Sequence, residues 1–234
     1  MKKMASLLGT VVVAAGIVAL GGIAAKTQAQ VESFGLRLGY NSGSVTMPMS
    51  SFGNTLVWAQ RTPDRFTSSF GYHVGASVDI HISEIELGND PYMLGVAPSA
   101  LFVLKGGSRD RRFSDSQNRT HNSKYEISAY YLDIPVPVTF KRDFGSYVIR
   151  AELGPYVAVG LFGEQKYYAR TADFEVKEDA FSDEGLARVD IGLFYGVAVE
   201  FTNRYFVAIR AGSGLTDENI TSYYVTFGYN FKLN

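Results

Sequence analysis

The sequence YYLDIPVPVTFKRDFGSYVIRAELGPYVAVGL, residues Tyr130–Leu161, decides the fold. On both sides of its central KRDFGS, apolar residues occupy every second position, which is the period of a β-strand and not of a helix. The apolar row consists of Tyr130, Leu132, Ile134, Val136, Val138 and Phe140 before the turn, and of Tyr147, Ile149, Ala151, Leu153, Val157 and Val159 after it. Each arm is long enough to cross a bilayer, which takes a tilted strand roughly 9–11 residues. Pairing Lys141 with Ser146 places both rows on one face, which we interpret as the lipid-facing side of one quarter of a transmembrane barrel.

The same alternation recurs along the chain and predicts eight strands. They span residues 34–41, 70–81, 92–104, 130–140, 147–161, 189–201, 205–212 and 223–231. An even number of strands with alternately long and short connections is typical of up-and-down outer-membrane β-barrels, whose long loops are extracellular. Aromatic belts at both membrane interfaces are a further expectation for such barrels. The predicted periplasmic belt is Phe34, Tyr92, Phe140, Tyr147, Phe201, Tyr205 and Phe231, and the predicted outer belt is Tyr40, Phe70, Phe102, Tyr130 and Tyr223.

Residues 1–29 have the parts of a secretory signal peptide: two lysines at the start, an apolar run over residues 7–25 and a cleavage site at Thr27-Gln28-Ala29. The alternative is a permanent membrane anchor, but the run is short and contains glycines. We therefore predict a signal peptide over residues 1–29 and one β-barrel domain over residues 30–234. The expected location is the bacterial outer membrane, reached through the periplasm.

The composition excludes several classes of protein. A formal net charge of −1 gives no electrostatic case for nucleic-acid binding. No stretch after residue 30 approaches the roughly 18 uninterrupted apolar residues of a spanning helix. The chain has no cysteine, so disulfides, thiol chemistry and a lipoprotein anchor are absent.

The second face of most predicted strands carries glycine, alanine, serine and a few charged residues. A soluble lipocalin-like barrel would turn its apolar row inward and cover its outside with lysine and glutamate. We therefore place the polar row inside, where ionised groups must be paired. The predicted salt-bridged network of the lumen comprises Arg37, Asp79, Asp133, Arg150, Glu152, Asp190, Glu200 and Arg210. An eight-stranded barrel is just wide enough to be filled by side chains, which argues against a general diffusion pore.

Four prolines, Pro98, Pro135, Pro137 and Pro155, fall inside predicted strands. Proline cannot donate a ladder hydrogen bond, and a closed barrel has no free edge. We expect bulges or a locally widened seam at these positions.

Candidate reaction chemistry is sparse. His73, Ser77 and Asp79 share one face of a strand, but residues four apart on a strand are roughly 13 Å apart, which excludes a local Ser–His–Asp arrangement. The acidic residues of segment 173–184 lack the pattern of a calcium loop. We expect no enzymatic activity, no metal and no cofactor.

The second long loop is basic. At the cell surface its side chains are placed to contact lipopolysaccharide phosphates, and a merely solvated loop is the alternative. The candidate contacts are Lys105, Arg109, Arg111 and Arg112.

Several segments resemble the PorT-like outer-membrane β-barrel family of Bacteroidetes, often labelled porin-family proteins. They are FGLRLGYNSG (34–43), YLDIPVPVTF (131–140), AELGPYVAVG (151–160), VDIGLFYGVAVEF (189–201) and YYVTFGYNF (223–231), so that the resemblance covers essentially the whole mature chain. It implies an outer-membrane location, insertion by the barrel assembly machinery and, for one member type, assistance in protein secretion. The chain departs from the usual assembly signal, a terminal aromatic residue, because Lys232, Leu233 and Asn234 follow Phe231.

These observations predict a non-enzymatic outer-membrane barrel with a structural or surface-interaction role. Its specificity would lie in loops 42–68, 105–125 and 162–186, because variable function usually resides in loops on a rigid scaffold. The alternative is an accessory component of a protein secretion system, which would contact partner proteins through the periplasmic turns and the lipid-facing wall. A third hypothesis is a membrane hydrolase.

Overall fold

The computed structural model describes residues 29–44, 46–47, 64–65, 67–68, 70–87, 90–114, 120–169, 174–182, 186–202, 204–215 and 220–233. The predicted signal peptide therefore lies outside the described residues, apart from Ala29. The strands are β1 Gln30–Ser44, β2 Thr46–Met47, β3 Asp64–Arg65, β4 Thr67–Ser68, β5 Phe70–Leu87, β6 Asp90–Val96, β7 Ser99–Ser114, β8 Thr120–Pro135, β9 Val138–Asp143, β10 Tyr147–Ala169, β11 Phe174–Asp179, β12 Val189–Phe201, β13 Tyr205–Gly214 and β14 Thr221–Lys232. Among these residues, no helix is long and apolar enough to span a membrane.

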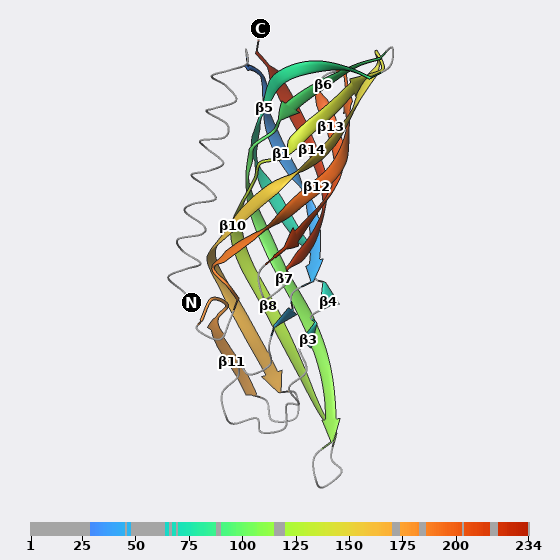
Figure 1. The fold of residues 1–234 in the computed structure, drawn as a ribbon. Helices are drawn as coiled ribbons and strands as arrows, with labels where there is room; N and C mark the ends of the chain where they lie inside the picture. The colour runs from blue at the N-terminus through green and yellow to red at the C-terminus, as the bar shows by residue number, and fades with distance from the viewer. Residues whose placement is uncertain are drawn as a thin grey trace.

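The strand pairings close a barrel. Strand β1 pairs with both β5 and β14, and β10 pairs with β12, so the first and last parts of the chain meet. Strands β6 and β7 are two halves of one strand, as are β8 and β9. Counted in this way, the described residues form a ring of eight antiparallel strands (Figure 1). The predicted all-β antiparallel barrel is confirmed.

The prolines account for the two interrupted strands. Breaks fall at Ala97-Pro98 and at Val136-Pro137, which lie beside each other in the sheet because the amide of Ala97 donates to the carbonyl of Pro137 at 2.9 Å. The amide of Val136 donates to the carbonyl of Pro155 on β10, also at 2.9 Å. Pro98, Pro137 and Pro155 thus lack a donor, but the carbonyl of each still accepts a hydrogen bond from the neighbouring strand, so the wall stays closed.

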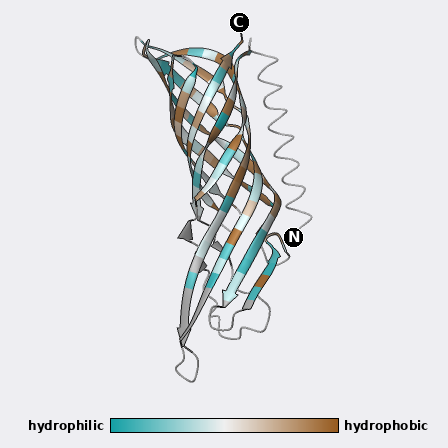
Figure 2. Ribbon diagram, turned by 180° about the vertical axis from the view of Figure 1, so that it is seen from behind, coloured by the Kyte–Doolittle hydropathy of each residue, from teal (hydrophilic) through white to brown (hydrophobic). Residues whose placement is uncertain are grey.

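The burial pattern shows the predicted inversion of polarity. On β1, Leu36 and Leu38 are 56% and 59% exposed, whereas Arg37 between them is 2% exposed. The same alternation holds on β10, where Leu153 faces outward and Arg150 and Glu152 are buried. Figure 2 shows hydrophobic and hydrophilic positions interspersed along the barrel strands. The lipocalin-like alternative is contradicted, because its apolar rows would face inward.

The register of the hairpin that decides the fold differs from the prediction. Lys141 pairs with Arg150 and not with Ser146. The turn is tighter than predicted and lies further along the chain: pairing continues to Asp143 and Val148, the amide of Phe144 donates to the carbonyl of Tyr147, and Gly145 has a positive φ of 83°. The two registers differ by four positions, and an even shift leaves every side chain on the same face. The inward and outward faces predicted for this hairpin are therefore correct, although the predicted register is not.

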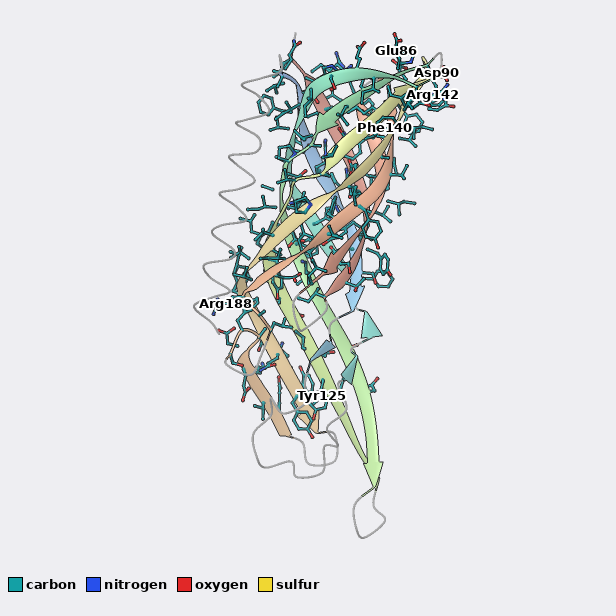
Figure 3. The ribbon with its side chains drawn as sticks, in the orientation of Figure 1. Glu86, Asp90, Tyr125, Phe140, Arg142 and Arg188 are labelled. Atoms are coloured by element: carbon teal, nitrogen blue, oxygen red, sulfur yellow. The ribbon has the colours of Figure 1, made fainter. Side chains whose placement is uncertain are left out.

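Short turns connect the strands at one end of the barrel, which we call the short-turn end. Arg142 and Asp90 form an ion pair of 2.7 Å at this end (Figure 3). Here lie Tyr92 and Phe140, whose rings are stacked 4.7 Å apart, and the paired Phe34 and Phe231. We call the other end, where β7, β8 and β10 extend, the hairpin end.

At the hairpin end the predicted loops 105–125 and 162–186 are wrong over much of their length. Strands β7 and β8 continue as a paired hairpin to Ser114 and Thr120, and β10 continues to Ala169 and pairs with β11. These extensions form a four-stranded blade that projects beyond the barrel (Figure 1). Its strands carry apolar residues such as Tyr125, Ile127 and Tyr167 at alternate positions, a signal that the surrounding charged residues obscured.

Candidate functional site

The described part of the barrel interior contains ten buried lysine, arginine, aspartate and glutamate side chains, with equal numbers of cations and anions. They are Arg37, Lys105, Lys141, Arg150, Arg210, Asp79, Asp133, Glu152, Asp190 and Glu200. They enter the lumen because the polar positions of each strand alternate with the outward apolar row. Buried charge is costly unless it is paired, so the arrangement of these groups determines what the lumen can do.

Arg150 is the centre of the charged network. Its Nη1 donates to Oδ1 of Asp79 at 2.9 Å, and its Nε lies 2.8 Å from Oε1 of Glu152. Arg210 reaches across the lumen and binds Glu152 with two hydrogen bonds, of 2.6 and 3.0 Å. Arg37 lies 3.9 Å from Asp79. Three guanidinium groups and two carboxylates from five different positions of the wall therefore cross-link the barrel internally.

The Phe206 ring lies among these three arginines. The guanidinium carbon of Arg37 is 3.9 Å from the ring centroid, and those of Arg150 and Arg210 are each 5.4 Å away. Cations are attracted to the face of an aromatic ring, so Phe206 provides apolar contact without unpairing the ions. A cavity of about 10 Å³ lies beside this cluster. That is about the volume one water molecule needs.

A second network lies nearer the hairpin end. Lys105 forms an ion pair of 3.0 Å with Asp133, and Tyr224 donates to the same carboxylate at 2.9 Å. Tyr156 donates to Asp190 at 2.6 Å. These tyrosines belong at the same time to an aromatic core, so the polar groups here are embedded in apolar surroundings.

That core fills the hairpin end of the lumen. Tyr131 and Phe181 make an edge contact at 5.4 Å, and Tyr125 and Tyr167 lie 4.7 Å apart. Phe181 comes from the segment after β11, which returns over the lumen and packs on Gly160, where any side chain would collide with its ring. The lumen is thus filled from the arginine cluster to the base of the blade.

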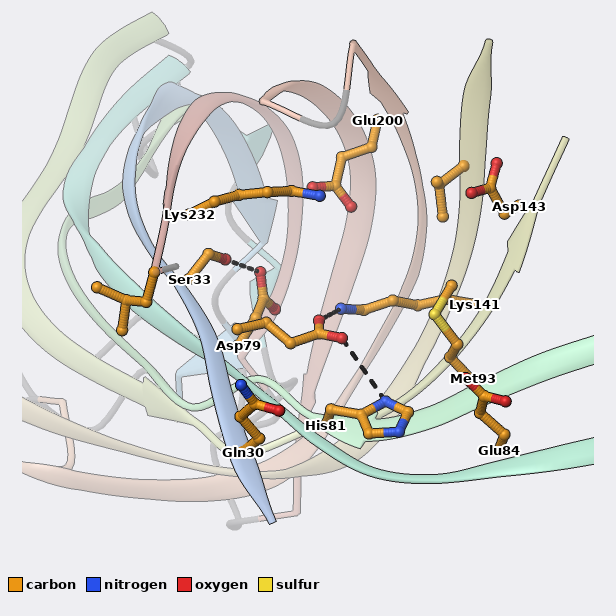
Figure 4. Close-up of a pocket in the computed structure, with 13 residues that line it drawn as sticks. Gln30, Ser33, Asp79, His81, Glu84, Met93, Lys141, Asp143, Glu200 and Lys232 are labelled. Atoms are coloured by element: carbon orange, nitrogen blue, oxygen red, sulfur yellow. Dashed lines mark hydrogen bonds and ion pairs between the residues drawn. The ribbon is translucent and has the colours of Figure 1, made fainter. Parts of the chain in front are cut away.

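The short-turn end, in contrast, holds an open vestibule of about 480 Å³ (Figure 4). Glu32 bridges two cations at its wall: Lys141 at 2.7 Å and, if protonated, His81 at 3.6 Å. Lys232 points toward Glu200. The vestibule ends at Asp79, which accepts a hydrogen bond from Ser33 at 3.2 Å and is held by Arg150.

The eight residues of the predicted lumen network are all buried in the structure, and five of them, Arg37, Asp79, Arg150, Glu152 and Arg210, form one cluster. Asp133 and Asp190 lie in the second network. Glu200 accepts a hydrogen bond from Asn230 close to the vestibule.

Sequence reasoning assigned Lys105 to the wrong surface. It was predicted as a lipopolysaccharide contact in a loop, but β7 continues through it and its position in the alternation turns it inward, where it is 4% exposed. Lys141 was not assigned to the network either. The predicted list contained three cations and five anions, and this imbalance was a signal that two inward cations had been missed. The side chains of Arg109, Arg111 and Arg112 lie outside the described residues.

Neither the candidate Ser–His–Asp arrangement nor a metal centre is formed by the described residues. His73 bonds to Thr226 at 3.0 Å and Asp79 to Arg150, so neither is directed at Ser77. Within the same part of the chain, no group of three or more histidine, cysteine, aspartate or glutamate residues could hold a metal ion.

One family of outer-membrane barrels matches most of the chain. A family model described as outer membrane protein beta-barrel domain matches residues 28–219. Ail, the attachment invasion locus protein of Yersinia pestis, solved in complex with the heparin analogue sucrose octasulfate, is 13% identical with a TM-score of 0.37, over 86% of this chain and 100% of that chain. Neisserial surface protein A is 11% identical with a TM-score of 0.39, over 88% of this chain and 99% of that chain. No curated protein matches the sequence.

Proposed function

We propose a role for this chain from one premise: it belongs to the outer membrane protein beta-barrel domain family and is an outer-membrane β-barrel protein. The proposed role is that of a non-enzymatic, sealed barrel that presents its hairpin end to the cell exterior and interacts there with the surface environment. Residues 1–29 are removed on export, and residues 30–234 are the barrel domain. The barrel assembly machinery inserts it.

The filled lumen carries this proposal. A solute that entered the vestibule would meet the ion pairs of Arg150 with Asp79 and Glu152, and beyond them the aromatic core around Tyr131 and Phe181. The cavity beside the ion pairs measures about 10 Å³. Passage of a solute would require several buried ion pairs to break together, which is costly because each partner would be left unpaired away from water.

Single-channel recording in planar bilayers tests the sealed lumen. We expect no stable conductance steps from the wild-type barrel, and steps from a variant in which Arg150, Glu152 and Arg210 are all replaced by alanine. Stable wild-type conductance would contradict the proposal. The triple variant serves as the positive control, provided that its folded band is seen on an unheated gel.

The hairpin end supports the surface-interaction role. Long extensions are extracellular in barrels of this type. The edge of the blade formed by β7 carries Arg109, Arg111 and Arg112, for which we propose contact with lipopolysaccharide phosphates, since guanidinium groups bind phosphate through paired hydrogen bonds. Accessibility of a cysteine introduced at Asp110 to a membrane-impermeant maleimide on whole cells tests the orientation. Labelling only after the outer membrane is permeabilised would contradict it.

A second candidate function is an accessory role in protein secretion, as the PorT-like resemblance to Bacteroidetes proteins implies. The vestibule favours it, because about 480 Å³ of charged, unfilled space opens at the short-turn end, which faces the periplasm in the proposed orientation. Cross-linking from a photoreactive residue at Glu84 distinguishes the two. A fixed periplasmic protein partner supports the secretion role, and the absence of any partner supports the first proposal.

A further inference from the structure

Three aromatic rings lie together on the outward face of the barrel at the hairpin end. The rings of Tyr130 and Phe162 are 4.6 Å apart and tilted, and Phe102 stacks on Tyr130 at 5.3 Å. A bulge between Gly160 and Phe162 shifts the register of β10, so that Leu161 and Phe162 are both exposed. We call Phe102, Tyr130 and Phe162 the aromatic shelf. Amphipathic rings in such a position lie at the headgroup level of a bilayer.

Directly beyond the shelf, the outward-facing residues change from apolar to polar. On β8 and β10 the next outward residues form two cross-strand pairs, Ser128 with Glu164 and Glu126 with Lys166. We call these four residues the polar wall. The wall is held in place by its own ion pairs: Lys166 contacts Glu164 at 3.1 Å, and Lys124 contacts Glu126. The apolar surface that a membrane would cover therefore ends at the shelf.

A hollow of about 410 Å³ lies between the shelf and the wall. It is lined by Tyr130 and Phe162 of the shelf, by the polar wall and by Gly163. Its volume is within the range of about 300–1,000 Å³ typical of small-molecule sites. One side is an exposed ring face, since Phe162 is 55% exposed, and the other carries two carboxylates and a hydroxyl.

The chemistry of the hollow selects among headgroups. The hollow itself is lined by two carboxylates and one lysine, and Lys124 pairs with Glu126 without lining it. A phosphate in the hollow would therefore lie beside two like charges, which repel it. Carboxylates accept strong hydrogen bonds from hydroxyl groups, and each has two oxygens, so its pairing with a lysine does not exhaust it. An aromatic ring face offers apolar contact to a flat ligand. A sugar ring presents hydroxyls at its edge and carbon–hydrogen bonds on its face. It can therefore hydrogen-bond to the carboxylates on one side of the hollow and pack against the aromatic ring on the other.

We propose that this hollow binds a sugar ring of an outer-leaflet glycolipid, stacked on Phe162 and hydrogen-bonded to Glu164 and Glu126. The site rests on the proposed orientation, with the hairpin end outward, because only then does the shelf lie among outer-leaflet headgroups. It is separate from the phosphate contacts proposed for Arg109, Arg111 and Arg112. It uses no residue of the lumen, so it is independent of whether the lumen conducts.

The experiment measures how much glycolipid the purified full-length barrel retains. Folded barrel is reconstituted in nanodiscs that contain either lipopolysaccharide or phosphatidylethanolamine, extracted into detergent and analysed by native mass spectrometry. We expect retained lipopolysaccharide, and roughly fivefold weaker retention for Phe162→Ala, as lost aromatic contacts of this kind imply. Ser128→Tyr, which fills the hollow, should abolish retention by the same site.

The matched control is Tyr223→Ala. Tyr223 is 60% exposed and belongs to the predicted outer belt, as do Phe102 and Tyr130 of the shelf, but it lies on β14 and does not line the hollow. Equal loss for Tyr223→Ala and Phe162→Ala would overturn the proposal, as would equal retention of phosphatidylethanolamine by the wild type. Displacement of the lipid by a free glucosamine disaccharide would support the sugar as the recognised group. If the disaccharide does not displace the lipid and retention is lost only when the acyl chains are removed, the proposal is overturned. Folding of each variant is checked by its mobility on an unheated gel, and cysteine labelling at Asp110 reports the orientation separately.

Discussion

The two halves of the barrel interior are packed by different means. In the short-turn half, Arg150 and its carboxylate partners connect opposite walls through ion pairs, and the buried ring of Phe206 lies among the three guanidinium groups. In the hairpin half, rings such as Tyr131 and Phe181 form a continuous aromatic core with only a few polar groups embedded in it. The packed part of the short-turn half, which begins where the vestibule ends, depends on electrostatics, and the hairpin half depends on apolar burial.

The difference follows from where each half lies in the fold. The arginine cluster is enclosed by the complete ring of strands, where water is excluded and paired charges attract strongly. The hairpin half opens into the blade, where water reaches the rim. At that rim apolar burial remains favourable, whereas an exposed ion pair would be screened, and the ion pair of Lys105 with Asp133 is shielded by the aromatic core around it. The comparison predicts that the two halves respond differently to substitution.

The largest effect is expected for Arg150→Met. It leaves Asp79 and Glu152 with fewer counter-charges in a buried site, which costs about 3–5 kcal/mol of unfolding free energy. Urea unfolding of the barrel in lipid vesicles measures it. Arg204→Met, at an exposed turn, is the control, and a loss below about 1 kcal/mol for Arg150→Met would show that the cluster is not the main support of this half.

Phe181→Ala tests the other half. It removes a ring that packs on Tyr131 and Gly160 near the mouth of the lumen. Deletion of a buried phenylalanine costs about 3–5 kcal/mol, and we expect about 2–4 because this site can partly collapse. Phe144→Ala, at the exposed turn, provides the reference. Stability unchanged by Phe181→Ala would mean that the aromatic core is dispensable.

Lys141→Ala measures how much a vestibule ion pair contributes to stability, for comparison with the buried cluster. Glu32, the partner of Lys141, has a side chain that is 33% exposed, so water replaces part of the lost contact. We expect a loss of about 1 kcal/mol or less, reduced further at 1 M salt. A loss as large as that of Arg150→Met would remove the distinction between vestibule and lumen.

The smallest expected effect is the interaction free energy between a substitution in one half and a substitution in the other. Arg150 and Phe181 have no contact partner in common among those described above, so the effects of Arg150→Met and Phe181→Ala should add within about 0.5 kcal/mol in the double variant. Coupling well above that value, measured in the same unfolding assay, would show that the interior behaves as one unit.

The sequence by itself determined which face of each strand is apolar, because the two-residue period is local and unaffected by register. Arg150 and Leu153 were assigned to the correct faces even though the hairpin register was wrong by four positions. The sequence also predicted irregularities at four prolines, and strands are interrupted beside Pro98 and Pro137, whereas β10 continues through Pro155.

Only the tertiary structure decided where strands end and which charges meet. Whether Lys105 is a surface or a lumen residue depends on how far β7 extends, and that depends on pairing with β8 and on a core formed by residues distant in sequence. The contact between Arg210 and Glu152 joins positions 58 residues apart. Such partners are set by the closure of the ring, a long-range event that no local pattern encodes.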